Sequence, residues 1–281
     1  MWIYWWRIWR LTHYIFRGVV IDIDEFPQIK SVGRISYRRR KEGDGSWLNR
    51  ASSNKHQVFY GAIPTPDFGD SKVAAVLEID NIRNDDFPED EYEYIAMGMW
   101  FVKKAFFVAS VGMHSEIAAR NAWARNLVKR DQELCSISEN AEFIKEVMHF
   151  LGSEFGKEVP STEDHLYKIS AAYGDSLFDL GIGGIMFPSV QMAAKTFNIA
   201  IHSEVVDNQC IDIAAAAVMR GSKIKNDIIW GWYMQCPRVF NDELKWEETP
   251  AGSRISQNDL ERFRKIIESG GRLNQNTTFI S

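Results

Sequence analysis

The sequence has few cysteines, and their spacing excludes two common ways of stabilising a small fold. Among 281 residues there are 3 cysteines, Cys135, Cys210 and Cys236. They are odd in number and far apart, and no C-x-x-C pair occurs. Neither a disulfide framework nor a cysteine-rich zinc site is therefore predicted. Such a chain fits a reducing compartment, so we expect a cytoplasmic protein, or an effector delivered to that compartment.

Basic residues are in the minority as well. The chain has 33 lysines and arginines against 38 aspartates and glutamates, which gives a net charge of −5 and a pI near 5.8. Nucleic-acid binders usually carry a positive field, so we expect no direct binding of nucleic acid. The length allows one large domain or two small ones, and it is long enough to bury a proper core.

Long apolar runs without charge are missing. The tryptophan-rich start of the chain is interrupted by Arg7, Arg10, His13 and Arg17. It contains no uncharged run of about 18 residues, and no apolar segment followed by a small-residue cleavage site, so it predicts neither a transmembrane segment nor a signal peptide. We expect residues 1–33 to pack their tryptophans on the domain. A helix lying in a membrane interface is the alternative.

Several motifs that carry chemistry are absent. The sequence has no G-x-G-x-x-G after a strand, no phosphate-binding G-x-x-x-x-G-K-[ST], no G-x-S-x-G and no H-E-x-x-H. The glycine-rich segment 181–184 is too short to be either of the first two. The 6 histidines never fall at metal-ligand spacing. No metal is therefore predicted.

The apolar pattern predicts strands near both ends of the chain and helices between them. Runs rich in β-branched and aromatic residues predict strands at 57–63, 72–79, 94–110, 183–190, 196–201 and 227–234. Helix formers with periodic apolar positions predict helices within 114–131, 136–155, 161–174 and 257–271. This order, strands then helices then strands, indicates an α+β fold.

Helix ends and domain limits are also predicted. Ser136 with Glu139 matches a capping box at the start of the second helix, and Gly174 is placed as the C-cap of the third. A helical insertion is expected around 112–158. We expect three parts, which are the tryptophan-rich segment, a main domain and a helical tail, at residues 1–33, 34–240 and 241–281.

The segment "EYEY" contains a pair of glutamates, Glu91 and Glu93, with one residue between them. Arginine-modifying ADP-ribosyltransferases use such an E-x-E pair late in the chain. Here the pair is early and lies in an acidic stretch, so a solvated acidic turn is the favoured interpretation.

Four separated segments carry the strongest functional signal. They are "SYRRRK", "NRASSNKHQVFYGA", "AAVLEI" and "GIMFPSV". They supply, in chain order, Arg38, Arg50, Tyr60, Glu78 and Ser189. This order resembles the RES domain family, in which two arginines, a tyrosine closing a strand, a glutamate closing the next strand and a serine follow one another. The segment "FNIAI" after the serine is also similar to a strand of that family.

The resemblance implies a fold, a substrate and a partner. RES domains are similar to ADP-ribosyltransferases, so it implies a mixed twisted β-sheet core with flanking helices over the main domain. It implies that NAD is the substrate. It further implies a toxin or effector domain with a neutralising antitoxin or immunity protein. Arg34 and Arg40 remain alternatives to Arg38 as the first arginine.

The resemblance also implies a role for each residue. Arg38 and Arg50 are expected to hold the pyrophosphate of NAD, because guanidinium groups bind phosphate oxygens through paired hydrogen bonds. Glu78 is the catalytic carboxylate, which stabilises the positive charge that develops on the ribose. Tyr60 is expected to stack on the nicotinamide, and Ser189 to orient it or the ribose. Arg50, Tyr60, Glu78 and Ser189 should then converge on one cleft.

Each of these residues alone has a structural explanation. Arg50 would be a loop arginine in a surface pair, Tyr60 a core tyrosine, and Ser189 a turn residue or N-cap. Taken together they favour an NAD glycohydrolase or phosphorylase. Two alternatives stay open: a mono-ADP-ribosyltransferase acting on a protein or nucleic acid, and a non-enzymatic binding module that docks through its aromatic N-terminus.

Overall fold

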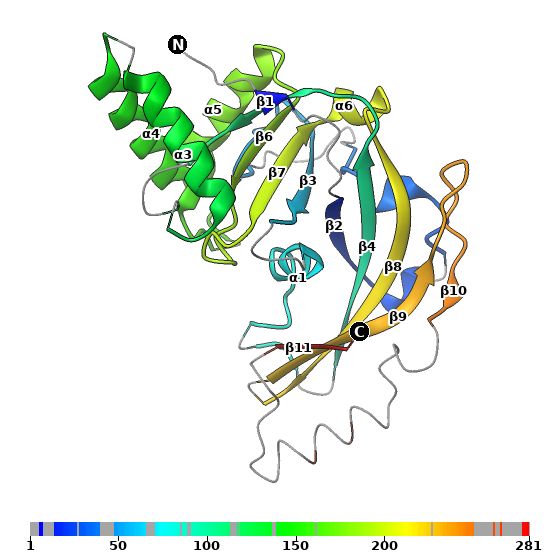
Figure 1. The fold of residues 1–281 in the computed structure, drawn as a ribbon. Helices are drawn as coiled ribbons and strands as arrows, with labels where there is room; N and C mark the ends of the chain where they lie inside the picture. The colour runs from blue at the N-terminus through cyan, green and yellow to red at the C-terminus, as the bar shows by residue number, and fades with distance from the viewer. Residues whose placement is uncertain are drawn as a thin grey trace. The chain divides into compact units, whose positions relative to one another are not determined.

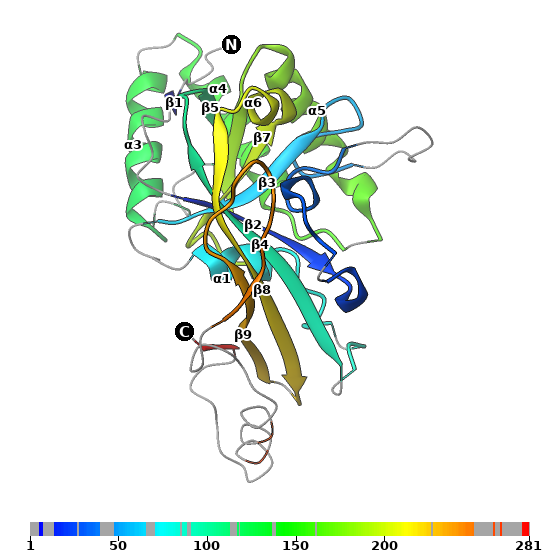
Figure 2. The ribbon, with the colours of Figure 1, turned by 90° about the vertical axis from the view of Figure 1, so that its right-hand side faces the viewer.

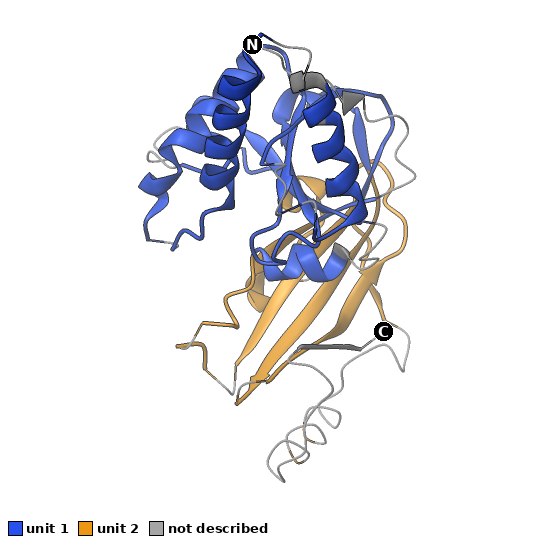
Figure 3. Cartoon of the chain, turned by 60° about the vertical axis from the view of Figure 1, so that its left-hand side comes forward, with its two compact units in different colours: residues 1–16, 37–78, 100–212 blue, residues 17–36, 79–99, 213–281 orange. Residues whose placement is uncertain are grey.

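The structure of the protein is a computed structural model with a mixed α+β architecture, as the sequence predicts (Figure 1). It describes residues 6–7, 14–26, 28–39, 48–65, 71–84, 86–88, 91–112, 117, 119–136, 139–160, 162–225, 227–249, 261, 265 and 277–280. The chain divides into two compact units, each assembled from three separated stretches (Figure 3). Unit 1 comprises residues 1–16, 37–78 and 100–212, and unit 2 comprises residues 17–36, 79–99 and 213–281.

Unit 1 contains a mixed sheet. Its strands follow the spatial order β1 (Trp6–Arg7), β5 (Phe107–Ser110), β6 (Gly184–Pro188), β7 (Phe197–His202) and β3 (Val58–Ile63). The β5–β6 pair is parallel, and the other three pairs are antiparallel. Every residue of β6 is buried, which fits the uninterrupted apolar sequence of a central strand.

Helices of unit 1 cover this sheet. They are α1 (Ser71–Leu77), α3 (Ala122–Ser136), α4 (Ala141–Gly156), α5 (Lys168–Asp179) and α6 (Ser203–Asp207), with a 3-10 turn η3 (Asp164–Tyr167) before α5. α3 packs along α4, which contacts α5 and β6, while α1 packs on β3.

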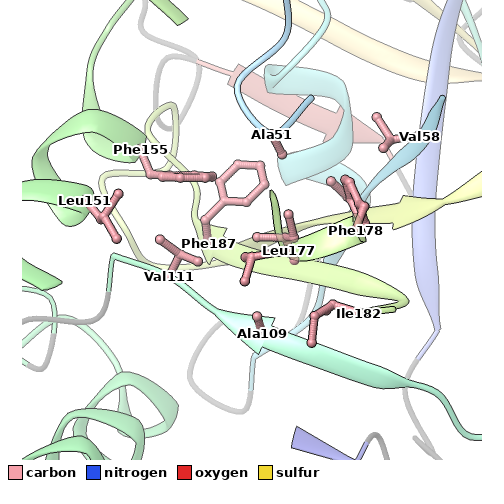
Figure 4. Packing of buried hydrophobic residues seen from close by; sticks show 12 residues of the cluster. Ala51, Val58, Ala109, Val111, Leu151, Phe155, Leu177, Phe178, Ile182 and Phe187 are labelled. Carbon is pink, nitrogen blue, oxygen red and sulfur yellow. The ribbon is translucent and has the colours of Figure 1, made fainter. Parts of the chain in front are cut away.

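The core of unit 1 lies between α4, α5 and the sheet (Figure 4). Its members are apolar side chains from these elements and from the loops next to them: Ala51, Val58, Ala109, Val111, Leu151, Phe155, Leu177, Phe178, Ile182, Ile185, Phe187 and Ala200. The fully buried Phe155 ring lies 5.5 Å from the Phe187 ring, centroid to centroid. Burial of these side chains supplies the main favourable term for folding this unit.

Unit 2 is built mainly on long strands. They are β2 (Ile15–Ile21), β4 (Tyr92–Val102), β8 (Ile211–Ile224), β9 (Asp227–Cys236) and β10 (Glu247–Glu248), in that spatial order, with β11 (Thr277–Ile280) parallel to β9. The first two residues of β2, the last three of β4 and the first two of β8 belong by sequence to unit 1. Figure 2 shows β4, β8 and β9 side by side. Two 3-10 turns, η1 (Ile23–Glu25) and η2 (Val32–Arg34), follow β2.

The turn between β8 and β9 is tight. Ile224 pairs with Asp227, and Lys225 between them has a positive φ of 54°. Gly221 on β8 lies directly over the Trp230 ring, because a Cβ added there would be 2.7 Å from the ring carbons. Glycine at this position therefore leaves room for the ring of Trp230, the largest fully buried side chain of unit 2, over β8.

The strand predicted at 72–79 is wrong. The segment forms α1, which ends at Leu77 and buries Ala74, Ala75 and Val76. A short run of alanine and valine has no clear period of 2 or 3.6, and alanine is the best helix former, so the helix is compatible with the same letters. Glu78 consequently follows a helix and not a strand.

Two predicted helix ends are also wrong. Ser136 is the last residue of α3, and the N-cap of α4 is Asn140, whose side chain makes no capping hydrogen bond. Gly174 lies inside α5, where its missing side chain allows close approach of another segment. The strands β2 and β8 were not predicted. Of the helix predicted at 257–271 only residues 261 and 265 are described, and both are helical; most of the tryptophan-rich start lies outside the described residues.

The remaining predicted strands and helices are confirmed. β3, β6, β7 and β9 overlap the ranges 57–63, 183–190, 196–201 and 227–234, and the range 94–110 contains most of β4 and all of β5. α3, α4 and α5 overlap the three predicted central helices. In the part of the chain that the structure describes, no helix is long and apolar enough to cross a membrane.

We predict that Gly174→Ala destabilises unit 1. The added Cβ would overlap the carbonyl oxygen of Ala51 and lie 2.7 Å from its carbonyl carbon, and backbone atoms cannot move aside cheaply. A loss of about 1–3 kcal/mol in the free energy of unfolding is expected, as for other overpacked sites. Urea denaturation followed by circular dichroism measures it.

The matched control is Gly156→Ala at the end of α4. No atom lies within 4 Å of a Cβ added at Gly156. Alanine has the higher helix propensity, so this variant should keep or slightly raise stability. Equal midpoints for the two variants would contradict the close packing of Ala51 on α5.

Candidate functional site

Glu78 and Ser189, which are far apart in the sequence, meet in unit 1. Ser189 directly follows β6 and its side chain is fully buried. Its Oγ donates a hydrogen bond to Glu78 Oε1 at 2.5 Å and accepts one from the Met192 amide at 3.1 Å. Glu78 itself is exposed. The buried serine therefore fixes the position of an accessible carboxylate.

The backbone around Glu78 makes this anchoring necessary. The Glu78 amide donates to the Ala74 carbonyl at 3.2 Å, which places the residue at the C-terminal end of α1. The helix dipole is negative at that end and disfavours a carboxylate. A hydroxyl donor to a carboxylate makes a short, charge-assisted bond that offsets this effect. The carboxylate is held where the helix alone would not favour it.

Arg50 lies at the end of α4. Its Nη1 donates to the carbonyl oxygens of Phe155 at 2.6 Å and Lys157 at 2.8 Å, and its Nη2 donates to the Tyr167 hydroxyl at 3.3 Å. The guanidinium carbon also lies 5.0 Å from the centre of the Tyr167 ring. The last carbonyls of a helix have no partner within it, so Arg50 caps α4 from a distant loop.

Tyr60 lies beside the same loop. It pairs with Ala200 across β3 and β7, and its hydroxyl accepts a hydrogen bond from the Ala51 amide at 2.9 Å. Burial is the main cause that raises the pKa of the Tyr60 hydroxyl. Arg50 and Ala51 form a tight turn, closed by the hydrogen bond from the Asn49 amide to the Ser52 carbonyl at 2.9 Å. In this turn Arg50 contacts α4, and the next residue, Ala51, contacts Tyr60.

The loop is further anchored on α5. The Ser53 amide donates to Asp175 Oδ1 at 3.1 Å, and the Ser53 hydroxyl makes a short hydrogen bond to the other oxygen of the same carboxylate. Asp175 is buried one residue after Gly174, on which the Ala51 carbonyl packs. Backbone and side-chain contacts together fix the loop over one turn of α5.

The early arginines are distributed differently. Arg38 is exposed. On either side of it in the chain, the Tyr37 hydroxyl donates to Asp207 at 2.8 Å, and Arg39 pairs with the same carboxylate at 3.3 Å. Arg34 belongs to unit 2, where it forms a salt bridge with Glu25 at 2.8 Å. Arg40 lies outside the described residues.

The structure thus brings the predicted residues together in pairs. Arg38, Arg50, Tyr60, Glu78 and Ser189 all belong to unit 1. Glu78 contacts Ser189, and Arg50 is linked to Tyr60 through Ala51. The hydrogen bonds of Arg50 go to the α4 end and Tyr167, whereas the hydroxyl of Ser189 serves Glu78. Convergence of both pairs on one cleft stays a prediction.

The E-x-E pair is only half solvated. Glu91 is exposed, but Glu93 is 4% exposed and points into unit 2. Its carboxylate accepts hydrogen bonds from the Asn81 amide at 2.8 Å, the Asn81 side chain at 3.0 Å and the Ile82 amide at 3.3 Å. Burial raises the pKa of Glu93, and these donors oppose the shift. The interpretation of the pair as a solvated turn is wrong for Glu93, which instead holds the 80–82 turn.

A histidine pair that sequence spacing did not reveal lies at the other end of the loop. His56 Nδ1 and His202 Nε2 are 3.0 Å apart, although the residues are 146 positions apart in the chain. His56 Nε2 is 3.1 Å from Asp179 Oδ1, and Lys55 forms a short ion pair with the other Asp179 oxygen. The Glu204 amide donates to His202 Nδ1 at 3.3 Å.

These contacts assign the protons of the pair. Because the Glu204 amide donates to His202 Nδ1, the proton of neutral His202 lies on Nε2 and points at His56 Nδ1. His56 then carries its proton on Nε2 and donates to Asp179. One proton therefore lies between the two rings. Burial, followed by the charge of His56, lowers the pKa of His202, while Glu204 opposes this.

Neither the Glu78–Ser189 contact nor the His56–His202 pair resembles a metal centre. Within the described ranges of the chain, no group of three or more histidine, cysteine, aspartate or glutamate side chains has a metal-binding arrangement. Comparison with models of protein families, with curated proteins and with solved structures found nothing that matches this chain. The contacts of its own residues are therefore the basis for the proposed function.

We predict that Arg50→Lys destabilises unit 1 although it keeps the charge. A lysine ammonium is a compact point charge and cannot reproduce the planar fork that reaches two carbonyls and the Tyr167 hydroxyl. Loss of these bonds should lower the free energy of unfolding by about 1–3 kcal/mol. Urea denaturation measures the change. Arg39→Lys is the control, since the Arg39 side chain is 78% exposed. Similar losses in both would contradict the capping role.

We predict that the histidine pair makes stability fall in mild acid. The folded-state pKa of His202 is lowered from 6.5, so the unfolded chain takes up a proton first as the pH falls. The contribution to stability is complete above pH 6.5 and is lost as the pH falls below that value. Urea denaturation at pH 7.5 and pH 5.0 compares wild type with His202→Asn, which keeps an acceptor but does not titrate.

The wild type should lose more stability between these two pH values than His202→Asn does. His165→Asn, at an exposed position in η3, is the control and should behave like the wild type. Parallel pH profiles for wild type and His202→Asn would rule out this explanation.

Proposed function

We propose that the protein is an NAD-consuming enzyme that cleaves the bond between nicotinamide and ribose. The observation that carries the proposal is the contact of Glu78 with Ser189: an exposed carboxylate whose position is set by a buried hydroxyl. A solvated surface glutamate needs no such support. A catalytic carboxylate does, because it acts only when it is held in place before the reaction.

The chemistry asks for one such group. As the glycosidic bond of NAD breaks, its electron pair leaves with nicotinamide, which departs as a neutral molecule, and positive charge builds on the ribose. A carboxylate below that carbon stabilises the charge, as in glycoside hydrolysis. Water then adds to the sugar, the hydroxyl oxygen stays on ADP-ribose, and one proton is released. If phosphate adds in place of water, the reaction is phosphorolysis, and the product is ADP-ribose with a phosphate on the ribose.

The other residues have narrower roles in this proposal than the resemblance alone implies. Ser189 has no exposed surface, so it acts through Glu78 and not on the nicotinamide. Tyr60 could contribute only its half-buried ring, which also packs against the core, since its hydroxyl binds the Ala51 amide. Arg50 uses three of its five N–H donors on α4 and Tyr167, and Arg38 is exposed. Binding of the pyrophosphate would thus rest on Arg38 and the remaining donors of Arg50.

The finer description of the fold belongs to the same proposal. An ADP-ribosyltransferase-like arrangement would have a mixed sheet as its core. The parallel and antiparallel pairing of β5, β6 and β7, with Ser189 directly after β6, supports this proposal.

We predict that Glu78→Gln abolishes NAD cleavage and leaves the fold intact. The amide keeps the shape of the side chain but cannot neutralise a developing cation, so turnover should fall about 10²–10³-fold. Purified protein is incubated with NAD, and free nicotinamide is measured by chromatography. Glu146→Gln, at an exposed position on α4, is the control and should retain full activity.

The products distinguish the versions of the reaction. Free ADP-ribose indicates hydrolysis, a phosphorylated sugar that needs added phosphate indicates phosphorolysis, and label from NAD on a lysate protein or nucleic acid indicates transfer. If wild type and Glu78→Gln release nicotinamide at the same rate, the assignment of Glu78 is wrong.

A further inference from the structure

We propose that Asn121 is a positioning residue that holds Ser189 against Glu78. It acts by binding the loop between β6 and β7, residues 189–196. As a role in catalysis the inference rests on the function proposed above. As a statement about the geometry of Ser189 it can be tested without turnover.

Ser189 is built into this loop at several points. Its amide donates to the Thr196 carbonyl at 3.0 Å, and its carbonyl accepts from the Ala194 amide at 2.8 Å. Its Oγ accepts from the Met192 amide at 3.1 Å, and donates to Glu78. The direction of the hydroxyl therefore depends on how the following residues turn. Any change in the loop moves the Met192 amide and so the Ser189 Oγ.

The loop adopts a conformation that its sequence does not favour. Ala193 and Ala194 have φ angles of 48° and 63°, two consecutive residues in the left-handed region. Alanine is disfavoured there because its Cβ crowds the following carbonyl oxygen, and only glycine adopts this region freely. A strained turn of this kind persists where its surroundings over-determine it, and such turns gather at functional sites.

Three side chains from elsewhere bind the strained turn at consecutive carbonyls. Arg120 Nη1 donates to the Ala193 carbonyl at 2.8 Å, Asn121 Nδ2 to the Ala194 carbonyl at 2.8 Å, and Thr65 Oγ1 to the Lys195 carbonyl at 2.9 Å. Peptide planes bound in sequence cannot rotate out of the left-handed conformation without breaking these bonds. The external donors therefore maintain what the local sequence opposes.

Asn121 is the central and best-protected of the three. It is 1% exposed, whereas Arg120 is on the surface, where water competes for its hydrogen bond. Asn121 is also fixed at its other end: its Oδ1 accepts the Ala124 amide at 2.7 Å, which caps the first turn of α3. One side chain thus ties the start of α3 to the loop that carries Ser189.

This arrangement gives the helical segment of the middle region a function. The start of α3 fixes the amide of Asn121, the amide fixes the Ala193–Ala194 turn, and the turn fixes the hydroxyl that holds Glu78. The helix makes no direct contact with Glu78 among these bonds. Its effect on the carboxylate passes through the backbone of residues 189–196.

The test uses a substitution that separates the two bonds of Asn121. Serine caps a helix as well as asparagine does, but its short side chain lacks the amide that reaches the Ala194 carbonyl. Asn121→Ser should therefore preserve α3 and release the loop. Asn84→Ser, at an exposed position in unit 2, is the control.

Two measurements are made on the full chain. In hydrogen–deuterium exchange, Asn121→Ser should exchange the amides of Met192 and Ala194 at least about tenfold faster, with α3 as protected as in the wild type. In steady-state kinetics with NAD, kcat should fall about tenfold with KM unchanged, because the misplaced group acts in the transition state. Asn84→Ser should match the wild type in both.

A rescue variant provides a second criterion. Glycine adopts the left-handed region without strain, so Asn121→Ser combined with Ala194→Gly should regain part of the lost kcat. A role for Asn121 in stability alone would not be repaired at Ala194. Failure of the second substitution to raise kcat in an active protein would overturn the proposed route through the turn.

The outcomes separate this inference from the function. If wild type releases no nicotinamide, the proposed function fails, and the exchange of Met192 and Ala194 still decides whether Asn121 positions Ser189. Unchanged exchange of these amides in Asn121→Ser would overturn the inference whatever the activity. Faster exchange with an unchanged kcat would overturn the catalytic role of Asn121 and keep the function.

Discussion

The close approach of the Ala51 carbonyl to Gly174 is the constraint on which the organisation of unit 1 depends. A side chain at position 174 would overlap that carbonyl, so only glycine lets the loop before β3 lie directly on α5. With the carbonyl placed there, the Ala51 amide points to the Tyr60 hydroxyl, and Arg50 reaches the end of α4. The absence of a methyl group at position 174 therefore lets the loop before β3 contact both α4 and α5.

Several polar side chains in the two units share one task, which is to bind backbone groups that secondary structure leaves without partners. Arg50 binds the last carbonyls of α4, Glu93 binds the amides of a turn, and Asn121 binds an amide of α3 and a loop carbonyl. Each helps to meet the requirement that buried backbone groups be hydrogen-bonded. Glu78 is different. It is exposed, and the buried hydroxyl of Ser189 donates a hydrogen bond to it. Here a buried side chain holds an exposed one and not a backbone group.

Local apolar patterns predicted the strands whose conformation is determined by their own residues. The β-branched and aromatic runs at 57–63 and 183–190 form β3 and β6, because a buried strand needs only an apolar sequence of that length. What failed depends on distant residues. Glycine is required at position 174 inside α5 because the Ala51 carbonyl packs on it. His56 contacts His202, which is 146 positions away in the chain. Likewise, the contact of Glu78 with Ser189 follows from chain order only through a resemblance, whereas the use of Arg50 as a cap has no local signal.

The helix before Glu78 changes the physical basis of the site. In a strand, Glu78 would face the same side as Val76, which is buried, and exposure of the carboxylate would depend on the strand's end. In the structure α1 ends at Leu77, and the carboxylate is exposed while Ala74, Ala75 and Val76 of the helix are buried. Neither alternation along a strand nor the helix dipole then favours the observed position of the carboxylate. That position depends on the Ser189 hydroxyl, hence on a strained turn whose geometry is imposed by side chains outside it. The anchoring of this carboxylate is therefore a property of the whole of unit 1 and not of the segment that contains Glu78.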